Sequence, residues 1–517
     1  MDLPSGTPQS DPNGPDQAIR DIVIVGGGTA GWMAAAALAR HLGHTGVTIT
    51  VVESSEIGTV GVGEATIPTI RRFYAQLGMS DAEVMSATGA SCKLGIRFVG
   101  WGGTGSDFIH PFGLYGQDLR GTGFHHYWMQ QRRTGDLTPL AAYSLGASLA
   151  SAGKFVEPSL NPPSSLSVFD WALHLDAALF ARHLRTFAEA SGCRRVDARI
   201  TGVELRPDDG FIRAVTLDGG REVAGDLFID CSGFRALLIG EAMGSTYEDW
   251  GAWLDCDAAF AVQSQTAPDV DPPPYTTVTA RAAGWQWGIP LRDRAGNGLV
   301  FSSRHMTDQQ ALDTLMTNLA GKPVTEPRRI GFRPGRRERA WVKNCVSLGL
   351  AAGFLEPLES TSIALIENGI ERLKSLFPDR TFAPAIIDEF NDQSAREMER
   401  TRDFIILHYW LNRRDEQFWR ERREAAIPDT LARKVALWKA RGQFIRYRWE
   451  MFHPASWLAI YDGFEVMPGQ IDPSVSGLDP VQLSRSLVQM RTAVADAVAG
   501  APDHAAFLAA LNRPRAA

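Results

Sequence analysis

Two ionisable side chains occur in surroundings where they could do chemistry. Lys93 lies in the weakly polar stretch 91–96, and an apolar run follows it. A lone lysine is ordinarily a solvated surface residue, but a lysine in an apolar cavity can act as a nucleophilic amine or orient an electrophile. Glu359 ends the segment 355–359, where two carboxylates flank a proline, and it could act as a base. Both interpretations of Lys93 stay open.

Thr361 and Ser362 stand just before a predicted helix that begins near Ile363. Backbone N–H groups point out of a helix start, so this position favours a small anion. His110 and Phe112 are two residues apart across a proline, and in extended backbone this spacing places both rings on one side. The pair suits a flat aromatic ligand, although core packing would give the same pattern.

Residues 21–53 supply the first part of a framework for these side chains. A β-branched run ends in a glycine-rich turn, a helical segment follows, and a second β-branched run closes on Glu53. Such a unit binds an adenine dinucleotide: its glycines permit a tight turn, close approach to the pyrophosphate and helix packing, and its acidic residue can accept from a ribose hydroxyl. The residues expected to bind the dinucleotide here are Gly26, Gly28, Thr29, Ala30, Gly31 and Glu53.

One later run is predicted to return to the same sheet, and another is strand-like. Residues 226–233 form an apolar run that ends at Gly233, and residues 345–350 form another that includes Leu348 and Gly349. A strand ending at glycine can place its backbone beside a second part of a bound dinucleotide. We therefore expect an α/β fold with a discontinuous, Rossmann-like nucleotide-binding domain.

Coarser patterns cover other segments. Residues 165–205 have a helical period, and residues 204–223 predict a hairpin. Residues 284–290 predict a strand with two indole rings on one face. The glycine-rich stretch 58–68 could lie against a flat ligand, move as a flap or form an ordinary loop. Residues 386–446 have a helical period and predict a second, mostly helical layer.

The composition argues against several classes of function. The 517 residues carry a formal net charge of -7, whereas a nucleic-acid or anionic-membrane partner normally needs a basic face. Five widely spaced cysteines include no CxxC pair, and eleven histidines show no metal-ligand spacing. The sequence contains no bilayer-length apolar run and begins without a secretory pattern. We expect a cytoplasmic protein with reduced thiols, no metal and small-molecule partners.

Four motifs in a fixed order carry a family resemblance. They are Gly26-x-Gly28-x-x-Gly31-Trp32, Lys93-Leu94-Gly95-Ile96, Trp285-x-Trp287-x-Ile289-Pro290 and Leu355-Glu356-Pro357-Leu358-Glu359-Ser360-Thr361. Together they resemble the flavin-dependent tryptophan halogenase family, and the WxWxIP motif is specific to flavin halogenases. The resemblance covers nearly the whole chain after the first 18 residues.

The resemblance implies an enzyme that uses FADH2, O2 and a halide. Chloride or bromide held near Thr361 and Ser362 would be oxidised at the flavin, and hypohalous acid would pass through an internal tunnel to Lys93. Lys93 would capture or orient this electrophile, and Glu359 would polarise it or remove the ring proton. The separation of the flavin from Lys93 and the substrate matters, because an open flavin site would lose the oxidant to water.

The resemblance also implies further site residues. A strap over the flavin would contribute Gly63, Glu64 and Ala65. The tunnel would be formed by Trp285, Trp287, Ile289 and Pro290, and the two tryptophans would keep substrate from the flavin. The substrate-binding residues would be His110, Phe112, Ser360, Phe452 and Trp457.

The C-terminal part departs from members that act on free tryptophan. Those members carry a Tyr-Tyr pair, a glutamate and a stacking tryptophan there. Here Phe452 stands at the tryptophan position, Tyr447 at the glutamate position, and residues 439–444 lack the pair. Losing the contacts to a buried ammonium would cost about 1.5 to 3 kcal/mol per hydrogen bond. We expect indole or an indole-containing substrate, as in the bromide-tolerant branch that the motif around Glu359 resembles.

Alternatives remain open: a halogenase of free tryptophan, an NAD(P)H-dependent flavin hydroxylase, or a non-catalytic flavin- or indole-binding protein. A halogenase implies a separate NAD(P)H-dependent flavin reductase as a transient partner, and we expect a monomer or homodimer. The expected division is a disordered leader over residues 1–18, a discontinuous FAD-binding part over 19–385 with inserted substrate-facing segments, and a mostly helical substrate-capping region over 386–517. The whole would resemble single-component flavin monooxygenases.

Overall fold

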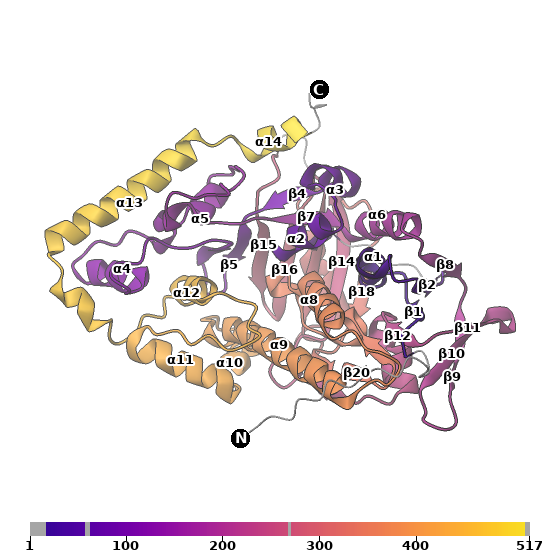
Figure 1. Ribbon diagram of the computed structural model, residues 1–517. Helices are drawn as coiled ribbons and strands as arrows, with labels where there is room; N and C mark the ends of the chain where they lie inside the picture. The colour runs from indigo at the N-terminus through magenta and orange to yellow at the C-terminus, as the bar shows by residue number, and fades with distance from the viewer. Residues whose placement is uncertain (1–16, 57–62, 267–269, 512–517) are drawn as a thin grey trace, which may run out of the picture.

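A computed structural model describes residues 17–56, 63–266 and 270–511. Most of the expected leader and part of the glycine-rich stretch 58–68 lie outside these ranges. Two sheets occupy the middle of the molecule, and helices α4, α5 and α11 to α13 gather on one side of them (Figure 1). The first sheet has the order β20 (Trp341–Val342), β21 (Cys345–Ser347), β12 (Leu227–Asp230), β1 (Asp21–Val25), β2 (Thr48–Glu53) and β8 (Arg194–Asp197).

This sheet is parallel except at β20, and its central strand is buried on both faces. A continuous β-branched run is therefore what β1 needs, since no side of it faces water. β1 pairs with β12, so the prediction that the run 226–233 returns to the first sheet is confirmed. The strand-like run 345–350 contributes β21, which the structure places beside β12 in the same sheet. The α/β class with a discontinuous Rossmann-like sheet is likewise confirmed.

The second sheet carries the aromatic strand. Its order is β18 (Arg328–Gly331), β14 (Ala258–Gln265), β17 (Arg294–Phe301), β16 (Gly284–Pro290), β15 (Thr276–Arg281), β5 (Gly95–Val99) and β6 (Asp107–Pro111). Neighbours are antiparallel except β15 and β5. It places His110, on β6, in the same sheet as the two indoles of β16.

Three small antiparallel sheets complete the strands. They are β3 (Gly63–Ala65), β7 (Ala172–Asp176) and β4 (Ser91–Lys93); β11 (Glu222–Ala224), β10 (Ile212–Leu217) and β9 (Ile200–Leu205); and β13 (Tyr247–Asp249), β19 (Gly335–Arg337) and β22 (Gly353–Phe354). β9 and β10 confirm the predicted hairpin. The helical expectation for residues 165–205 is wrong in part, because this segment holds β7, α6 (Ala177–Ala190), β8 and β9. β7 has only five residues, and a run this short next to a helix is easily taken for part of it.

The remaining helices surround these sheets. In chain order they are α1 (Thr29–Leu42), α2 (Thr69–Gln76), α3 (Asp81–Thr88), α4 (Phe124–Arg133), α5 (Leu145–Ser151), α7 (Asp308–Thr317), α8 (Ser362–Ser375), α9 (Pro384–Leu411), α10 (Gln417–Glu424), α11 (Asp429–Arg441), α12 (Pro454–Gly463), α13 (Pro480–Gly500) and α14 (His504–Leu511). Helices α9 to α11 occupy the segment 386–446 that the sequence predicts to be helical.

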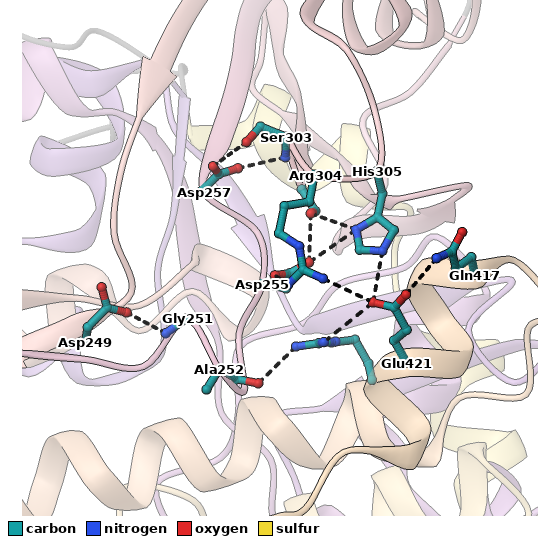
Figure 2. Close-up of polar contacts among 12 residues, drawn as sticks. Asp249, Gly251, Ala252, Asp255, Asp257, Ser303, Arg304, His305, Gln417 and Glu421 are labelled. Atoms are coloured by element: carbon teal, nitrogen blue, oxygen red, sulfur yellow. Dashed lines mark hydrogen bonds and ion pairs between the residues drawn. The ribbon is translucent and has the colours of Figure 1, made fainter.

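A polar cluster connects α10 to the end of the second sheet. Figure 2 shows His305, which follows β17, between Asp255 and Glu421 of α10. His305 Nδ1 lies 3.3 Å from Asp255 Oδ2, and His305 Nε2 lies 3.1 Å from Glu421 Oε2. Arg304 Nη1 donates to Asp255 Oδ1 at 2.9 Å. These contacts hold the helical layer against the sheet that carries the two indoles.

The five cysteines are free and buried. Within the described ranges, no helix is both long and apolar enough to cross a membrane. The same part of the chain contains no group of three or more His, Cys, Asp or Glu residues that could hold a metal ion.

Candidate active site

A cavity of about 720 Å³ lies at the carboxyl ends of β1, β2 and β12. Its volume falls in the roughly 300 to 1,000 Å³ typical of ligand sites, and this edge of a parallel sheet is where nucleotides bind. Ten of the residues predicted to bind the cofactor line it: Gly26, Gly28, Thr29, Ala30, Glu53, Gly63, Glu64, Ala65, Leu348 and Gly349. The structure thus gathers segments of the chain that are more than 300 residues apart.

The glycines of the first turn have separate physical roles. Gly26 has φ +110°, and a Cβ on it would lie 2.3 Å from the Cys231 carbonyl oxygen. A Cβ on Gly31, which is not among the lining residues, would lie 1.8 Å from the Gly26 oxygen, so Gly31 permits the helix to pack on the turn. No described atom lies within 4 Å of a Cβ built on Gly28. Space beside Gly28 and the start of α1 therefore fits a pyrophosphate.

Glu53 is held at the end of β2. Arg195 donates to its Oε1, and Arg185 Nη1 lies 3.9 Å from the same atom. A Cβ on Gly27 would lie 1.3 Å from Glu53 Oε2, so only glycine leaves room for this carboxylate. With its place beside the cavity, Glu53 fits contact with a ribose hydroxyl, and the residues as a set fit an adenine dinucleotide such as FAD.

The aromatic strand forms another wall of the cavity. Trp285, Trp287 and Ile289 line it, whereas Pro290 does not. The indole centroids are 6.0 Å apart, as expected for residues i and i+2 of one strand. Behind them lies the buried Glu356, whose Oε2 accepts from Trp285 Nε1 at 3.1 Å and from Tyr409 OH at 2.8 Å. Burial raises the pKa of Glu356 to about 7, although both hydrogen bonds oppose the rise.

Lys93 is fully buried, which rules out its interpretation as a solvated residue. Its Nζ donates to the Thr66 carbonyl oxygen at 2.9 Å and to Ser360 Oγ at 2.7 Å, and it lies 5.1 Å from the centroid of the Phe112 ring. Burial lowers the pKa of Lys93 to about 7, although the charge of Glu359 opposes the shift. A substantial share of the amine is therefore unprotonated, and nucleophilic, near neutral pH.

Ser360 lies between the cavity and the buried amine. It lines the cavity, while Lys93 and Glu359 are not among the lining residues. Its backbone is left-handed, with φ 58°. Thr361 caps α8, its Oγ1 is buried with no hydrogen-bond partner among the described residues, and Ser362 begins the helix and lines the cavity. The predicted helix start therefore faces the cavity, as an anion site requires.

Glu359 is buried between two histidines. Its Oε2 lies 2.9 Å from His110 Nδ1, and its Oε1 lies 2.8 Å from His408 Nε2. Burial acts to raise the pKa of Glu359, but the charges and hydrogen bonds of the two histidines outweigh it and lower the pKa to about 2. Sequence reasoning finds His110 but misses His408, because a histidine in the apolar stretch of α9 looks like an ordinary core residue.

Aromatic residues gather beside His110. The rings of Phe404 and Phe452 are stacked with centroids 3.9 Å apart, and Trp457 lies 5.0 Å from Phe404. His110 lies 5.9 Å from Phe404 and 6.4 Å from Phe452. The structure thus brings three of the predicted substrate residues, His110, Phe452 and Trp457, into one group, and Phe404 is a member that the sequence does not reveal.

A dinucleotide cavity beside a buried amine and a buried carboxylate defines a flavin-type redox enzyme. The protein-family model for tryptophan halogenase matches residues 21–480. Tryptophan 6-halogenase SttH of Streptomyces toxytricini is 34% identical over 518 residues, covering 95% of this chain and 98% of its own.

Solved structures agree with this match. BrvH, a flavin-dependent halogenase from Brevundimonas sp. BAL3, has a TM-score of 0.94 and 69% identity, covering 96% of this chain and all of that one. Xcc4156, a flavin-dependent halogenase from Xanthomonas campestris, has a TM-score of 0.92 and 43% identity. The match covers 97% of this chain and 100% of that one. The chain belongs to the tryptophan halogenase family. It is a flavin-dependent halogenase, an enzyme that uses FAD and a halide.

Proposed function

We propose that this halogenase acts on indole or an indole-containing small molecule, with O2 as co-substrate and bromide or chloride as the halide. The observation that carries the proposal is the 2.7 Å contact between Lys93 Nζ and Ser360 Oγ. Ser360 lines the dinucleotide cavity, so this contact connects the place where oxidant forms to a buried amine. An amine with a lowered pKa can take up or orient a positively polarised halogen.

Each part of the site has a proposed role. FADH2, when bound, supplies the electrons with which O2 and halide yield hypohalous acid. The N–H groups at Thr361 and Ser362 hold the halide, and the wall with Trp285 and Trp287 keeps the aromatic substrate away from the cavity. Lys93 then presents the electrophile. Glu359, ionised at neutral pH, polarises it or accepts the ring proton.

A neutral, flat substrate is supported by the residues around Phe452. His110, Phe404, Phe452 and Trp457 offer ring surfaces, which favour an indole. The nearby Lys434 is buried and already pairs with Glu450 at 2.7 Å, so it is not open to a substrate carboxylate. Free tryptophan is the second candidate, because SttH is named as a tryptophan 6-halogenase.

We propose that FADH2 comes from a separate NAD(P)H-dependent flavin reductase that meets the enzyme transiently. We also propose that residues 386–517 act as a cap over the substrate site. Helix α9 supports this role, because it contributes both His408 and Phe404 to the group around Glu359.

The test is mass spectrometry of products formed from enzyme, FAD, a flavin reductase, NADH and either bromide or chloride. Indole and tryptophan serve as parallel substrates, and Lys93→Ala is the paired variant. We expect a halogen mass shift that is larger for indole and vanishes in the variant. Equal turnover of the variant would remove Lys93 from the mechanism, and comparable specificity constants for the two substrates would contradict the indole assignment.

A further inference from the structure

His408 is enclosed in a way that fixes one of its protons. Its Nδ1 lies 2.7 Å from the carbonyl oxygen of Phe404, one turn earlier in α9. A carbonyl oxygen only accepts hydrogen bonds, so Nδ1 carries a hydrogen. The side chain is fully buried.

The other ring nitrogen of His408 faces a carboxylate. Nε2 lies 2.8 Å from Glu359 Oε1, and the second oxygen, Oε2, lies 2.9 Å from His110 Nδ1. An ionised carboxylate only accepts, so it requires a hydrogen on both of these nitrogens. His408 would then carry two ring hydrogens and a positive charge.

We infer that His408 is held as an imidazolium ion whose charge keeps Glu359 ionised and whose Nε2–H fixes the direction of the Glu359 carboxylate. His408 is on this account a positioning residue for the halogenation. The inference rests on the proposed role of Glu359. The alternative distribution of the same protons is a neutral His408 that accepts from a protonated Glu359.

The groups around the pair favour the ionic form. Aromatic rings surround His408, among them Phe98 at 5.1 Å, Trp101 at 6.3 Å and Phe464 at 6.4 Å between centroids. Burial among rings opposes a charge, so the ionic form depends on the ionisable neighbours. The ionisable groups facing Glu359 from the packed elements are His408 on α9, His110 on β6 and, through Ser360, Lys93 on β4. Each of these can be positive. The neighbouring buried carboxyl, Glu356, is turned to Trp285 and Tyr409 instead.

Removing the charge of His408 should therefore raise the pKa of Glu359. In His408→Gln, the amide can still donate to Oε1 but carries no charge. Desolvation, which the two histidines outweigh in the native protein, then raises the pKa of Glu359.

The direct test is ring-nitrogen NMR of full-length protein labelled with ¹⁵N-histidine, and it needs neither flavin nor turnover. The signal absent from His408→Gln belongs to His408. We expect both of its nitrogens to carry a hydrogen at pH 7. We further expect this signal to change to the neutral form in Glu359→Gln. A neutral His408 at pH 7, or the same charge state in both proteins, would overturn the inference.

Infrared spectroscopy provides a second test on the carboxyl itself. Glu359 should become protonated at a higher pH in His408→Gln than in the native protein. Subtracting the spectrum of the matched protein that also carries Glu359→Gln removes the band of Glu356. The same protonation pH for Glu359 with and without His408 would contradict the inference. Both experiments report protonation alone, so an enzyme that fails to halogenate indole would refute the proposed function without deciding this point.

Discussion

The Nζ of Lys93 lies 2.7 Å from the Oγ of Ser360, a residue that also lines the dinucleotide cavity. Lys93 comes from the small sheet β3–β7–β4, whereas Ser360 follows the turn before α8. The contact therefore depends on two elements that are 267 residues apart in sequence. A change in either element should therefore alter the surroundings of the amine.

Burial of the Lys93 amine predicts a pH-dependent stability. The pKa of Lys93 is about 7 in the folded protein, against 10.5 for an ordinary lysine, so between these values the unfolded chain binds more protons. Stability from this group then rises with pH across that window, by up to about 1.4 kcal/mol per pH unit. Lys93→Met should lack this rise. Urea unfolding at several pH values measures the free energy of unfolding, and Lys322→Met, at an exposed lysine, is the control. If the free energy of unfolding changed with pH in parallel for the native protein and Lys93→Met, the prediction would be wrong.

Glu359→Gln should affect both catalysis and Lys93. Removing an acid–base group commonly costs about 10²- to 10⁴-fold in rate, so a loss in this range is expected. Because the negative charge of Glu359 raises the pKa of Lys93, the variant should titrate Lys93 at lower pH than the native protein. NMR of ¹³Cε-labelled lysine measures this titration. The surface variant Glu465→Gln should leave it unchanged, and an unaltered Lys93 in Glu359→Gln would show that the two groups are uncoupled.

Ser360 permits a comparison of hydroxyl and backbone. Ser360→Ala and Ser360→Gly both remove the contact to Lys93 Nζ, but only glycine adopts φ 58° without strain. We expect both variants to lose halogenation to a similar extent, with Ser360→Gly more stable than Ser360→Ala by about 1 kcal/mol. Urea unfolding measures the stability of the two variants, and product assays measure their halogenation. Full activity in the glycine variant alone would mean that backbone conformation, not the hydroxyl, matters.

Two glycines of the first turn should separate cofactor binding from folding. Gly28→Ala adds a methyl group into open cavity space, so it should leave stability unchanged and weaken FAD binding at least about tenfold. Gly31→Ala places a Cβ 1.8 Å from the Gly26 oxygen and should destabilise the protein. Flavin fluorescence titration and thermal unfolding measure both effects, and Gly477→Ala, with open space around it, is the control. Native FAD affinity in Gly28→Ala would place the pyrophosphate elsewhere.

Much of the dinucleotide framework can be predicted from sequence because its determinants are local. The glycine turn, the β-branched strands and the apolar run at β12 each carry their own pattern, and they assemble as expected. The run at β21 has a strand pattern, but its place beside β12 comes from the structure alone. Strand β7 escapes prediction because it has only five residues and runs directly into α6.

The candidate site is less predictable because its environment is made by distant elements. Residues near Lys93 in sequence do not reveal that Thr66 and Ser360 enclose it. His408 and Phe404 join the site only because α9 lies against the turn that holds Glu359. A single sequence contains no local pattern that would distinguish these two residues from ordinary core packing.

The burial of the cysteines has a consequence for an enzyme that handles oxidised halide. The thiolate is the form that reacts readily with oxidants, and burial raises the pKa of all five thiols, that of Cys193 to about 11. Cys231 even borders the dinucleotide cavity, yet its thiol stays protonated there. The chain thus protects itself against inactivation by its own reagent, through the low polarity of its interior.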